Sequence, residues 1–179
     1  STECVACEAG TYSPMGAVSC TDCPAGVPDV DSDPGTVCVD CVPGQYAAAR
    51  STECIDCAAG EYNDAGPGEP CKACALGHYS AIRSTSCIQC LAGEIDLDSD
   101  PSTGCEVCPE GKHSTPGAHG AHETLHSCIS CQVGAFDSDS DAATACIPCP
   151  TGSFQPATTE TSCILCANGM YQPLEGMGA

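Results

Sequence analysis

The chain has 179 residues, among them 20 cysteines, 19 glycines and 14 prolines, and its formal net charge is −20. Only 24 residues are Val, Ile, Leu or Phe and none is Trp, which excludes a conventional core between two layers of helices or sheets. With four cations against 24 acids, the chain would be repelled by phosphate groups, so nucleic acid and anionic membranes are disfavoured as partners.

Covalent cross-links are the evident replacement for a core. Ordering a chain costs roughly 1–2 kcal/mol per residue, and small secreted domains commonly offset this cost with disulfides. Because disulfides persist outside the reducing cytosol, we expect a secreted, extracellular or cell-surface protein. No apolar run approaches the ~20 residues of a membrane span, so we expect no direct membrane insertion. The absence of a leader peptide at Ser1 fits a mature product or a segment of a longer protein.

Every cysteine belongs to a CxxC pair, and a glycine stands three residues after each pair, from Gly10 to Gly169. We call these ten residues the repeat glycines. A glycine at a fixed offset indicates a turn with positive φ, or a close approach of two chain segments beside a disulfide. The pairs begin at Cys4, Cys20, Cys38, Cys54, Cys71, Cys87, Cys105, Cys128, Cys146 and Cys163.

The nine loops between the pairs alternate in character. Odd loops place an aromatic residue two positions after the glycine, at Tyr12, Tyr46, Tyr79 and Phe154, although the seventh loop has His113. Even loops are acidic, and three of them share the patterns DVDSDPGTVC, DLDSDPSTGC and DSDSDAATAC. The repeat is therefore a two-loop unit of about 33 residues. Residues 1–179 would form a single tandem array of about five units, starting near Cys4, Cys38, Cys71, Cys105 and Cys146.

Gly, Pro, Ser, Thr and Asp interrupt the chain every few residues, and no segment has a sustained helical period. We therefore expect turns and short two-stranded β-ribbons with little or no helix. A unit of this size cannot bury a core alone, so it must pack on its neighbours along one axis. The expected fold class is a small disulfide-rich repeat array in the form of an elongated rod.

Two disulfide connectivities fit the spacing of the pairs. In a ladder, the second cysteine of each pair bonds to the first cysteine of the next, and Cys4 and Cys166 are left for residues outside this chain. In an interlaced scheme, Cys4–Cys20 and Cys7–Cys23 join two pairs, and the pattern recurs five times. Two CxxC pairs could instead bind zinc through four thiolates, although zinc modules usually occur as isolated pairs of pairs in basic surroundings.

The segment CEAGTYSPMGAVSC resembles the one-disulfide loop that opens a cysteine-rich module of the tumour-necrosis-factor-receptor family. The loop ending DPGTVC resembles that family's second half-module. More broadly, the spacing CxxCxxGxY…SxC is similar to the ephrin-receptor-like cysteine-rich repeats of animal receptors and protist surface proteins.

This resemblance covers nearly the whole chain and implies an extracellular, non-enzymatic array with a disulfide ladder, the connectivity we favour. Its rungs would be Cys7–Cys20, Cys23–Cys38, Cys41–Cys54, Cys57–Cys71, Cys74–Cys87, Cys90–Cys105, Cys108–Cys128, Cys131–Cys146 and Cys149–Cys163.

Three acidic loops carry aspartates at alternate positions, a pattern that suits Ca²⁺ with its six to eight oxygen ligands. They are not EF-hand loops, because Pro34, Pro101 or Ala142 stands where that loop needs glycine. Alternatively, the aspartates cap turn amides, with Thr36, Thr103 and Thr144 acting likewise just before the cysteine. The candidate calcium ligands are Asp29, Asp31 and Asp33; Asp96, Asp98 and Asp100; and Asp137, Asp139 and Asp141.

The seventh loop contains His122-Glu123-Thr124-Leu125-His126, which matches the HExxH of zinc proteases. That chemistry needs a helix, a cleft and a third ligand, and this Gly- and Pro-containing loop offers none of them, so we interpret the match as chance. Weak Zn²⁺ or Cu²⁺ binding by His119, His122 and His126 is one hypothesis, and a solvated insertion is the other. The chain has no N-glycosylation sequon; O-glycans on Ser and Thr would make it a glycoprotein.

No catalytic constellation or phosphate-binding glycine loop is evident, so we expect neither an enzyme nor an organic cofactor. The expected function is structural: a stiff, disulfide-laddered spacer or filament segment of a matrix, a cell coat or a surface appendage such as a flagellar hair. Its partners would be other extracellular proteins or copies of itself. The alternatives are a receptor or adhesion ectodomain that binds a protein ligand, and a thiolate zinc-binding protein with reduced cysteines.

Overall fold

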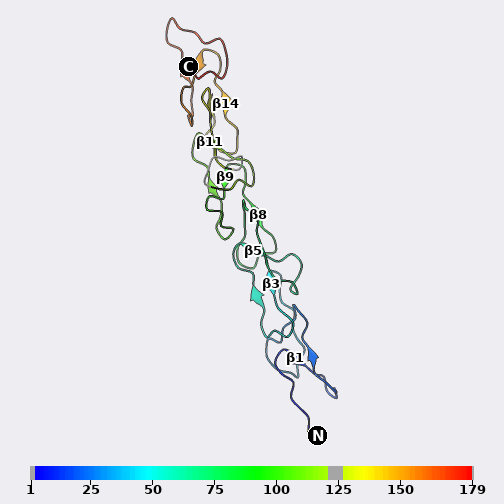
Figure 1. The fold of residues 1–179 in the computed structure, drawn as a ribbon. Helices are drawn as coiled ribbons and strands as arrows, with labels where there is room; N and C mark the ends of the chain where they lie inside the picture. Colours follow the sequence, from blue (N-terminus) through cyan, green and yellow to red (C-terminus); the bar gives the residue numbers. More distant parts are fainter. Residues whose placement is uncertain (1–2, 121–126, 179) are drawn as a thin grey trace. The chain divides into compact units, whose positions relative to one another are not determined.

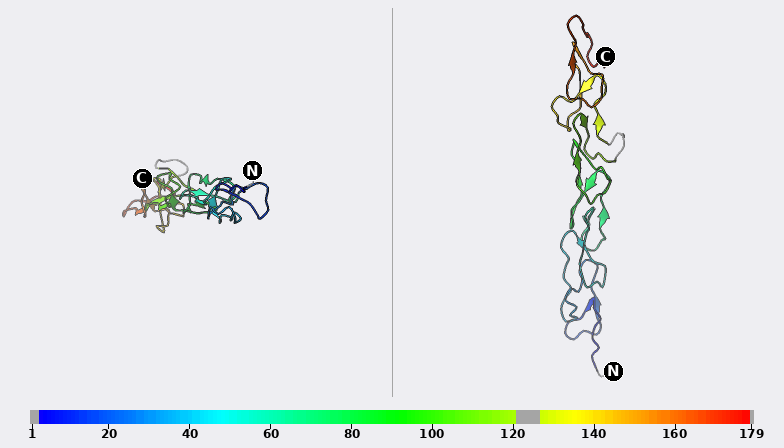
Figure 2. Two further views of the ribbon diagram at one scale, coloured as in Figure 1. Left: turned by 90° about the horizontal axis from the view of Figure 1, so that it is seen from below. Right: turned by 90° about the vertical axis from the view of Figure 1, so that its left-hand side faces the viewer.

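The computed structural model describes residues 3–120 and 127–178. These residues form no helix, and their regular structure consists of two-residue strands paired into eight antiparallel ribbons (Figures 1 and 2). The expected fold class of turns and short ribbons is confirmed. The strands are β1 (Thr11–Tyr12), β2 (Thr21–Asp22), β3 (Gln45–Tyr46), β4 (Ile55–Asp56), β5 (Glu61–Tyr62), β6 (Lys72–Ala73), β7 (His78–Tyr79), β8 (Ile88–Gln89), β9 (Glu94–Ile95), β10 (Glu106–Val107), β11 (Lys112–His113), β12 (Ile129–Ser130), β13 (Ala135–Phe136), β14 (Ile147–Pro148), β15 (Ser153–Phe154) and β16 (Ile164–Leu165).

Each ribbon has the same origin in the sequence. The two residues after a repeat glycine pair with the two residues inside the next CxxC, as when β1 pairs with β2 and β15 with β16. The second loop forms no strand, since Pro28 has no backbone N–H to give to a ladder. Even there, the Val39 N–H donates to the carbonyl of Pro28 at 3.0 Å.

Nine disulfides close the nine loops in the ladder order, so the second cysteine of each pair is bonded to the first cysteine of the next (for example Cys7–Cys20 and Cys149–Cys163). The ladder prediction is confirmed, and the interlaced scheme is wrong. Cys4 and Cys166 keep free thiols. Because eighteen of the twenty sulfur atoms are bridged, they cannot serve as the thiolates of a zinc site.

The bridges also take the place of a core. The second cysteine of every pair from Cys23 to Cys149 is buried, and Cys23, Cys57, Cys90 and Cys149 have no exposed surface. The hydrophobic cluster in the described residues is small: Ile95, Cys108 and Ala118, with Cys128 and Ala142 against it. Disulfides with one buried cysteine each thus take the place of a hydrophobic core between layers of helices or sheets.

All ten repeat glycines have a positive φ, between 70° and 86°. This confirms the turn that their fixed offset predicts. The carbonyl of each repeat glycine from Gly10 to Gly152 accepts the N–H of the second cysteine of the next pair, at 2.8–3.0 Å. The turn therefore sets the direction of the chain, so that each ribbon ends beside a disulfide.

The chain divides into two compact units, each described here by itself. The first comprises Ser1–Cys74 and Ser80–Cys87 and contains β1 to β6 and five rungs of the ladder. The second comprises Ala75–Tyr79 and Ile88–Ala179 and contains β7 to β16 and four rungs. The five-unit division and the rod form stay predictions.

None of the described residues belong to a helix that is long and apolar enough to cross a membrane.

Candidate functional site

One buried position recurs in the contacts between successive loops. It lies three residues after the repeat glycine, and in the second to ninth loops its occupant is at most 6% exposed. In seven of these eight loops the occupant has a polar side chain. The occupants are Asp29, Ala47, Asn63, Ser80, Asp96, Ser114, Asp137 and Gln155.

Three of these buried residues are the first aspartates of the acidic triplets. Each carboxylate accepts a hydrogen bond from the N–H of the repeat glycine in the preceding loop. A charge-assisted bond of this kind is stronger than a neutral one and satisfies both buried groups. The pairs are Gly10 to Asp29 at 3.0 Å, Gly77 to Asp96 at 3.1 Å and Gly111 to Asp137 at 3.3 Å.

The same glycines also touch the loop two places further along the chain. A Cβ atom at Gly10, Gly77 or Gly111 would overlap the carbonyl oxygen of Arg50, Gly117 or Thr159, respectively. Three successive loops therefore meet at each of these glycines. The close approach that the glycine pattern predicts beside the disulfides is confirmed, and it is between loops that are not sequence neighbours.

A second recurring contact involves residues that sequence reasoning did not single out. Arg50, Arg83 and Thr159 have φ values of 62°, 63° and 64°, in the left-handed region that favours glycine. Gly117 and Gly176 occupy the corresponding places in their loops with φ of 77° and 68°. The N–H of each donates to the carbonyl of a buried cysteine one loop earlier: Arg50 to Cys23, Arg83 to Cys57, Gly117 to Cys90, Thr159 to Cys131 and Gly176 to Cys149, at 2.8–3.0 Å.

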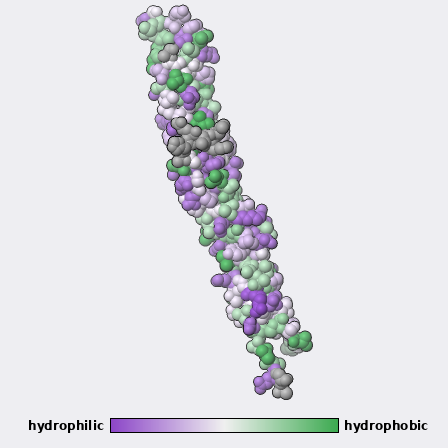
Figure 3. All heavy atoms as spheres, viewed as in Figure 1, coloured by the Kyte–Doolittle hydropathy of each residue, from purple (hydrophilic) through white to green (hydrophobic). Residues whose placement is uncertain are grey.

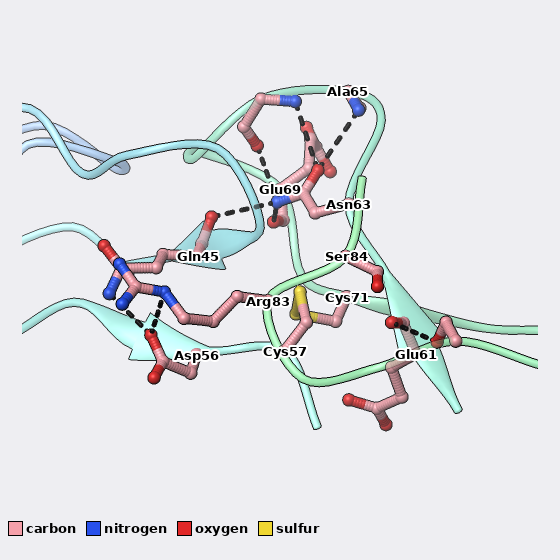
Figure 4. Close-up of a disulfide and its surroundings, with 12 residues drawn as sticks. Gln45, Asp56, Cys57, Glu61, Asn63, Ala65, Glu69, Cys71, Arg83 and Ser84 are labelled. Carbon is pink, nitrogen blue, oxygen red and sulfur yellow. Dashed lines mark hydrogen bonds and ion pairs between the residues drawn. A yellow bond between two sulfur atoms is a disulfide. The ribbon is translucent and has the colours of Figure 1, made fainter. Parts of the chain in front are cut away.

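The fourth loop keeps the buried contact with a neutral side chain (Figure 4). Asn63 Nδ2 donates to the Gln45 carbonyl of the preceding loop at 3.2 Å, and to the carbonyls of Gly66 and Glu69 in its own loop at 2.9 Å. Its Oδ1 accepts the N–H of Ala65 at 3.1 Å. At this position the Asn63 amide donates a hydrogen bond to the preceding loop. In the other even loops, the aspartate carboxylate accepts one from the preceding loop.

The second and third aspartates of each triplet turn back on their own loop. Asp31 accepts the Asp33 N–H and the Thr36 hydroxyl, both at 3.0 Å, and Asp33 accepts the Gly35 N–H at 2.9 Å. The capping interpretation is confirmed for the aspartates of all three loops, since Asp98 and Asp100, and Asp139 and Asp141, accept turn N–H groups in the same way. It is wrong for the threonines, because the hydroxyls of Thr36, Thr103 and Thr144 donate to an aspartate carboxylate and cap no amide.

These hydrogen bonds favour the ionised carboxylates. The Asp33 N–H, and then the Thr36 hydroxyl, lower the pKa of Asp31. The Asp141 N–H and the Thr144 hydroxyl lower the pKa of Asp139 in the same way. Ser102 lowers the pKa of Asp100 through its side chain and its backbone.

The acidic triplets are thus split between two tasks. The first carboxylate binds a neighbouring loop, and the other two cap a turn. Among residues 3–120 and 127–178, no three His, Cys, Asp or Glu side chains gather as they would around a metal ion. Calcium binding by these nine aspartates stays a prediction.

Of the three candidate histidine ligands, only His119 is described, since His122 and His126 lie outside the described residues. His119 Nδ1 is 3.0 Å from the carbonyl oxygen of Gly117. His113, the exception to the aromatic pattern, places its Nδ1 3.5 Å from the sulfur of Cys146 in the next loop. This imidazole therefore lies against the Cys131–Cys146 disulfide.

The surface carries mixed side chains and exposed ion pairs. Arg50 pairs with Glu8 at 3.2 Å, Lys72 with Asp64 at 2.8 Å and Arg83 with Asp56 at 3.3 Å (the last is visible in Figure 4). Such exposed pairs contribute at most about 1 kcal/mol each. On the face shown in Figure 3, hydrophobic residues are scattered among hydrophilic ones.

Together, the ladder, the ribbons and the repeated loop contacts define a disulfide-laddered cysteine-rich repeat array of the kind found in extracellular domains. Residues 137–179 match the family model described as "Tyrosine-protein kinase ephrin type A/B receptor-like". This match confirms the ephrin-receptor-like resemblance of the repeats. No curated protein matches the chain.

Proposed function

We propose that the chain is a structural spacer of the extracellular space, a stiff segment of a matrix, a cell coat or a surface appendage such as a flagellar hair. It would act without catalysis and without an organic cofactor. The observation that supports this most is the recurrence of one set of loop-to-loop contacts, seen at Gly10, at Gly77 and again at Gly111.

Stiffness would come from two kinds of restraint. Each disulfide closes a loop and stabilises it by about 3 kcal/mol through the lost entropy of the unfolded chain. Each loop is also held to its neighbour by hydrogen bonds, such as the buried bond from the Gly77 N–H to Asp96 Oδ2 at 3.1 Å and the half-buried bond from Ser80 Oγ to Glu61 O at 2.8 Å. Bending between loops would break buried hydrogen bonds that water could not easily replace.

The net charge of −20 suits this role. Like charges along the chain oppose compaction and keep the protein soluble. Secretion or cell-surface display, and contact with other extracellular proteins or with copies of itself, belong to the same proposal. O-glycans on exposed Ser and Thr would add to its solubility.

Small-angle X-ray scattering of the Cys4→Ser/Cys166→Ser double variant tests the spacer proposal. A compact domain of this length has a radius of gyration of about 16 Å. We expect at least twice that value, together with a rod-like cross-section that disappears after reduction with dithiothreitol. A radius of gyration near that of a compact domain would refute the proposal.

A receptor or adhesion ectodomain is the second candidate, favoured by the match of residues 137–179 to a receptor-like family. The two functions respond differently to replacement of the eighth loop by a copy of the sixth. A spacer keeps its scattering dimensions and its function, because the two loops make the same contacts. A receptor with its ligand site in this region would lose binding to its target cells while its dimensions stay the same.

A further inference from the structure

The junctions between loops provide an acceptor for the N–H of a repeat glycine in two ways. An even loop offers the carboxylate of its first aspartate, as Asp29 does to Gly10 at 3.0 Å. An odd loop offers a backbone carbonyl, as Ala47 does to Gly26 at 2.9 Å. In both cases the next loop along the chain satisfies the glycine N–H, so that no free donor is buried.

The junction at Gly44 lacks this acceptor. Gly44 is buried, and no described residue accepts its N–H. Asn63 stands where the acceptor is expected, but its Oδ1 accepts the N–H groups of Ala65 and Gly66 instead, both at 3.1 Å (Figure 4). Its Nδ2 donates to three carbonyls, including that of Gln45. The fourth loop thus brings a donor, and no acceptor, to Gly44.

The rest of this junction is the same as at Gly10. The φ angle is 80° at Gly44 and 79° at Gly10. The carbonyl of each accepts the N–H of the second cysteine of the next pair, at 2.9 and 3.0 Å, respectively. A Cβ at Gly44 would overlap the carbonyl oxygen of Arg83, which repeats the close approach at Gly10. The difference between the two junctions is therefore confined to the acceptor, and the Gly44 N–H is directed toward the fourth loop.

A cavity of about 370 Å³ lies at this junction, within the first compact unit. Gly44 and Asn63 both line it, so the N–H that has no acceptor belongs to its wall. Pro43 and Pro67 provide apolar surface, and the exposed residue Thr85 lies at its rim. A buried donor beside apolar walls suits an acceptor group on a short apolar stem.

The charges around the cavity are less negative than the net charge of −20 suggests. Three of the four cations of the chain, Arg50, Lys72 and Arg83, belong to the first unit. Lys72 pairs at 2.8 Å with Asp64, whose charged side chain lines the cavity. Arg83 pairs with Asp56 at 3.3 Å. An anionic acceptor would therefore meet carboxylates that are already paired with cations, and its charge would strengthen the bond to the N–H.

We propose that this cavity binds a carboxylate on a short apolar stem, in the form of an aspartate or glutamate side chain of an extracellular partner protein. The carboxylate accepts the Gly44 N–H, in the way that Asp29 accepts the Gly10 N–H, and the stem packs against Pro43 and Pro67. The site goes beyond the spacer role, because it gives the array a place of attachment that the regular junctions do not have.

Titration of the ¹⁵N-labelled 179-residue chain, followed by NMR, tests the site. The probes are sodium propionate, its neutral isostere propionamide, and N-acetyl-glutamate N-methylamide, which presents the carboxylate as a protein side chain does. We expect both carboxylates to shift the Gly44 amide signal with a Kd of about 1–10 mM. Propionamide should bind at least about fivefold more weakly. The Gly26 amide, which has its own acceptor, should not shift, and sodium chloride is the control for ionic strength.

Three outcomes of this titration would overturn the proposal. They are the lack of a saturable shift at Gly44, equal affinity for propionate and propionamide, and binding of propionate but not of the blocked glutamate. The last outcome would show a site for free carboxylates only. The scattering test measures dimensions and not binding, so either proposal can fail without the other.

Asn63→Asp supplies the acceptor from the chain itself, at the position that Asp29 and Asp96 occupy in their loops. We expect hydrogen exchange of the Gly44 amide to slow by at least about fivefold, and propionate should no longer shift its signal. Undiminished propionate binding by a folded Asn63→Asp variant would contradict the proposed site.

A second pair of variants leaves the bonds of Asn63 intact. Thr85→Glu places a fixed negative charge at the rim of the cavity and should weaken propionate binding by at least about threefold. Thr85→Gln is the matched control, since it has nearly the same shape without the charge and should bind propionate as the unsubstituted chain does. Equal affinity of the two variants would show that the carboxylate does not bind in this cavity.

Discussion

The buried carboxylate of Asp96 accepts the N–H of Gly77 at 3.1 Å, across 19 residues and from one loop to the one before it. Asp98 and Asp100, two and four residues further on, bind only their own loop. Aspartates two residues apart in one acidic run thus have different partners, one in the preceding loop and the others in their own loop.

Removal of the Asp96 carboxylate should therefore open the junction at Gly77. Asp96→Ala leaves the Gly77 N–H buried without an acceptor, which costs about 1–3 kcal/mol. We expect hydrogen exchange of the Gly77 amide, followed by NMR, to become faster by at least about fivefold. The exposed control Asp98→Ala should leave this amide protected, and equal exchange in the two variants would contradict the assigned contact.

Two glycines with similar backbones should respond very differently to an added methyl group. Gly77 and Gly152 both have positive φ, but a Cβ at Gly77 overlaps the Gly117 carbonyl, whereas nothing lies within 4 Å of one at Gly152. Gly152→Ala should therefore cost only the left-handed backbone strain, about 1–2 kcal/mol. Gly77→Ala should cost several times more and reduce the yield of correctly bridged protein, as measured by disulfide mapping of secreted material. Similar yields for the two would argue against the close approach.

Thr159 is a β-branched residue at a φ of 64°, where two other loops have glycine. Thr159→Gly should relieve the strain while it keeps the N–H bond to Cys131, and so stabilise the ninth loop by about 1 kcal/mol. Slower local hydrogen exchange at the Thr159 amide position measures this. Thr158→Gly has no strain to relieve and should give no such gain; a destabilised Thr159→Gly variant would show that the side chain itself is needed.

Acid should loosen the turns that aspartates cap. In the folded chain, the Asp141 N–H and the Thr144 hydroxyl hold the pKa of Asp139 below its ordinary value of 3.8. A lowered folded-state pKa means that this stabilisation is complete above the ordinary value and is lost as the pH falls through the lowered one. Thr144→Val removes one donor, so the pKa of Asp139 should rise toward 3.8 in a carboxyl-carbon NMR titration. Thr158→Val, which lies in another loop, should leave it unchanged.

Calcium, if bound, should compete with these caps. The turn carboxylates already have hydrogen-bond donors, so we expect weak binding with a Kd of about 10⁻³ M, as in extracellular calcium modules. Isothermal titration calorimetry measures it, and the amide signals of Asp33, Asp100 and Asp141 should shift as calcium is added. Micromolar affinity would instead require the first aspartate to leave its glycine, which exchange at Gly77 would reveal.

Sequence reasoning predicted the features that a single loop determines. The CxxC spacing and the family resemblance led to the ladder, the fixed glycine offset predicted positive φ at Gly10 and its counterparts, and the DxDxD patterns suggested turn caps. These predictions succeed because disulfide closure, glycine φ and side-chain capping act within one loop, over at most 20 residues. The calcium hypothesis treated Asp29, Asp31 and Asp33 as equivalent, whereas their environments differ.

What the sequence by itself determined is the repeat: twenty paired cysteines, ten turn glycines and too few large apolar residues for any other core. Only the tertiary structure decided which aspartate is buried, why Arg50 and Arg83 adopt a left-handed backbone, and which loop covers each glycine. The physical reason is that these properties are set by backbone groups one or two loops away, such as the Cys23 carbonyl that accepts from Arg50. A local pattern of residue types does not encode the position of a neighbour's carbonyl oxygen.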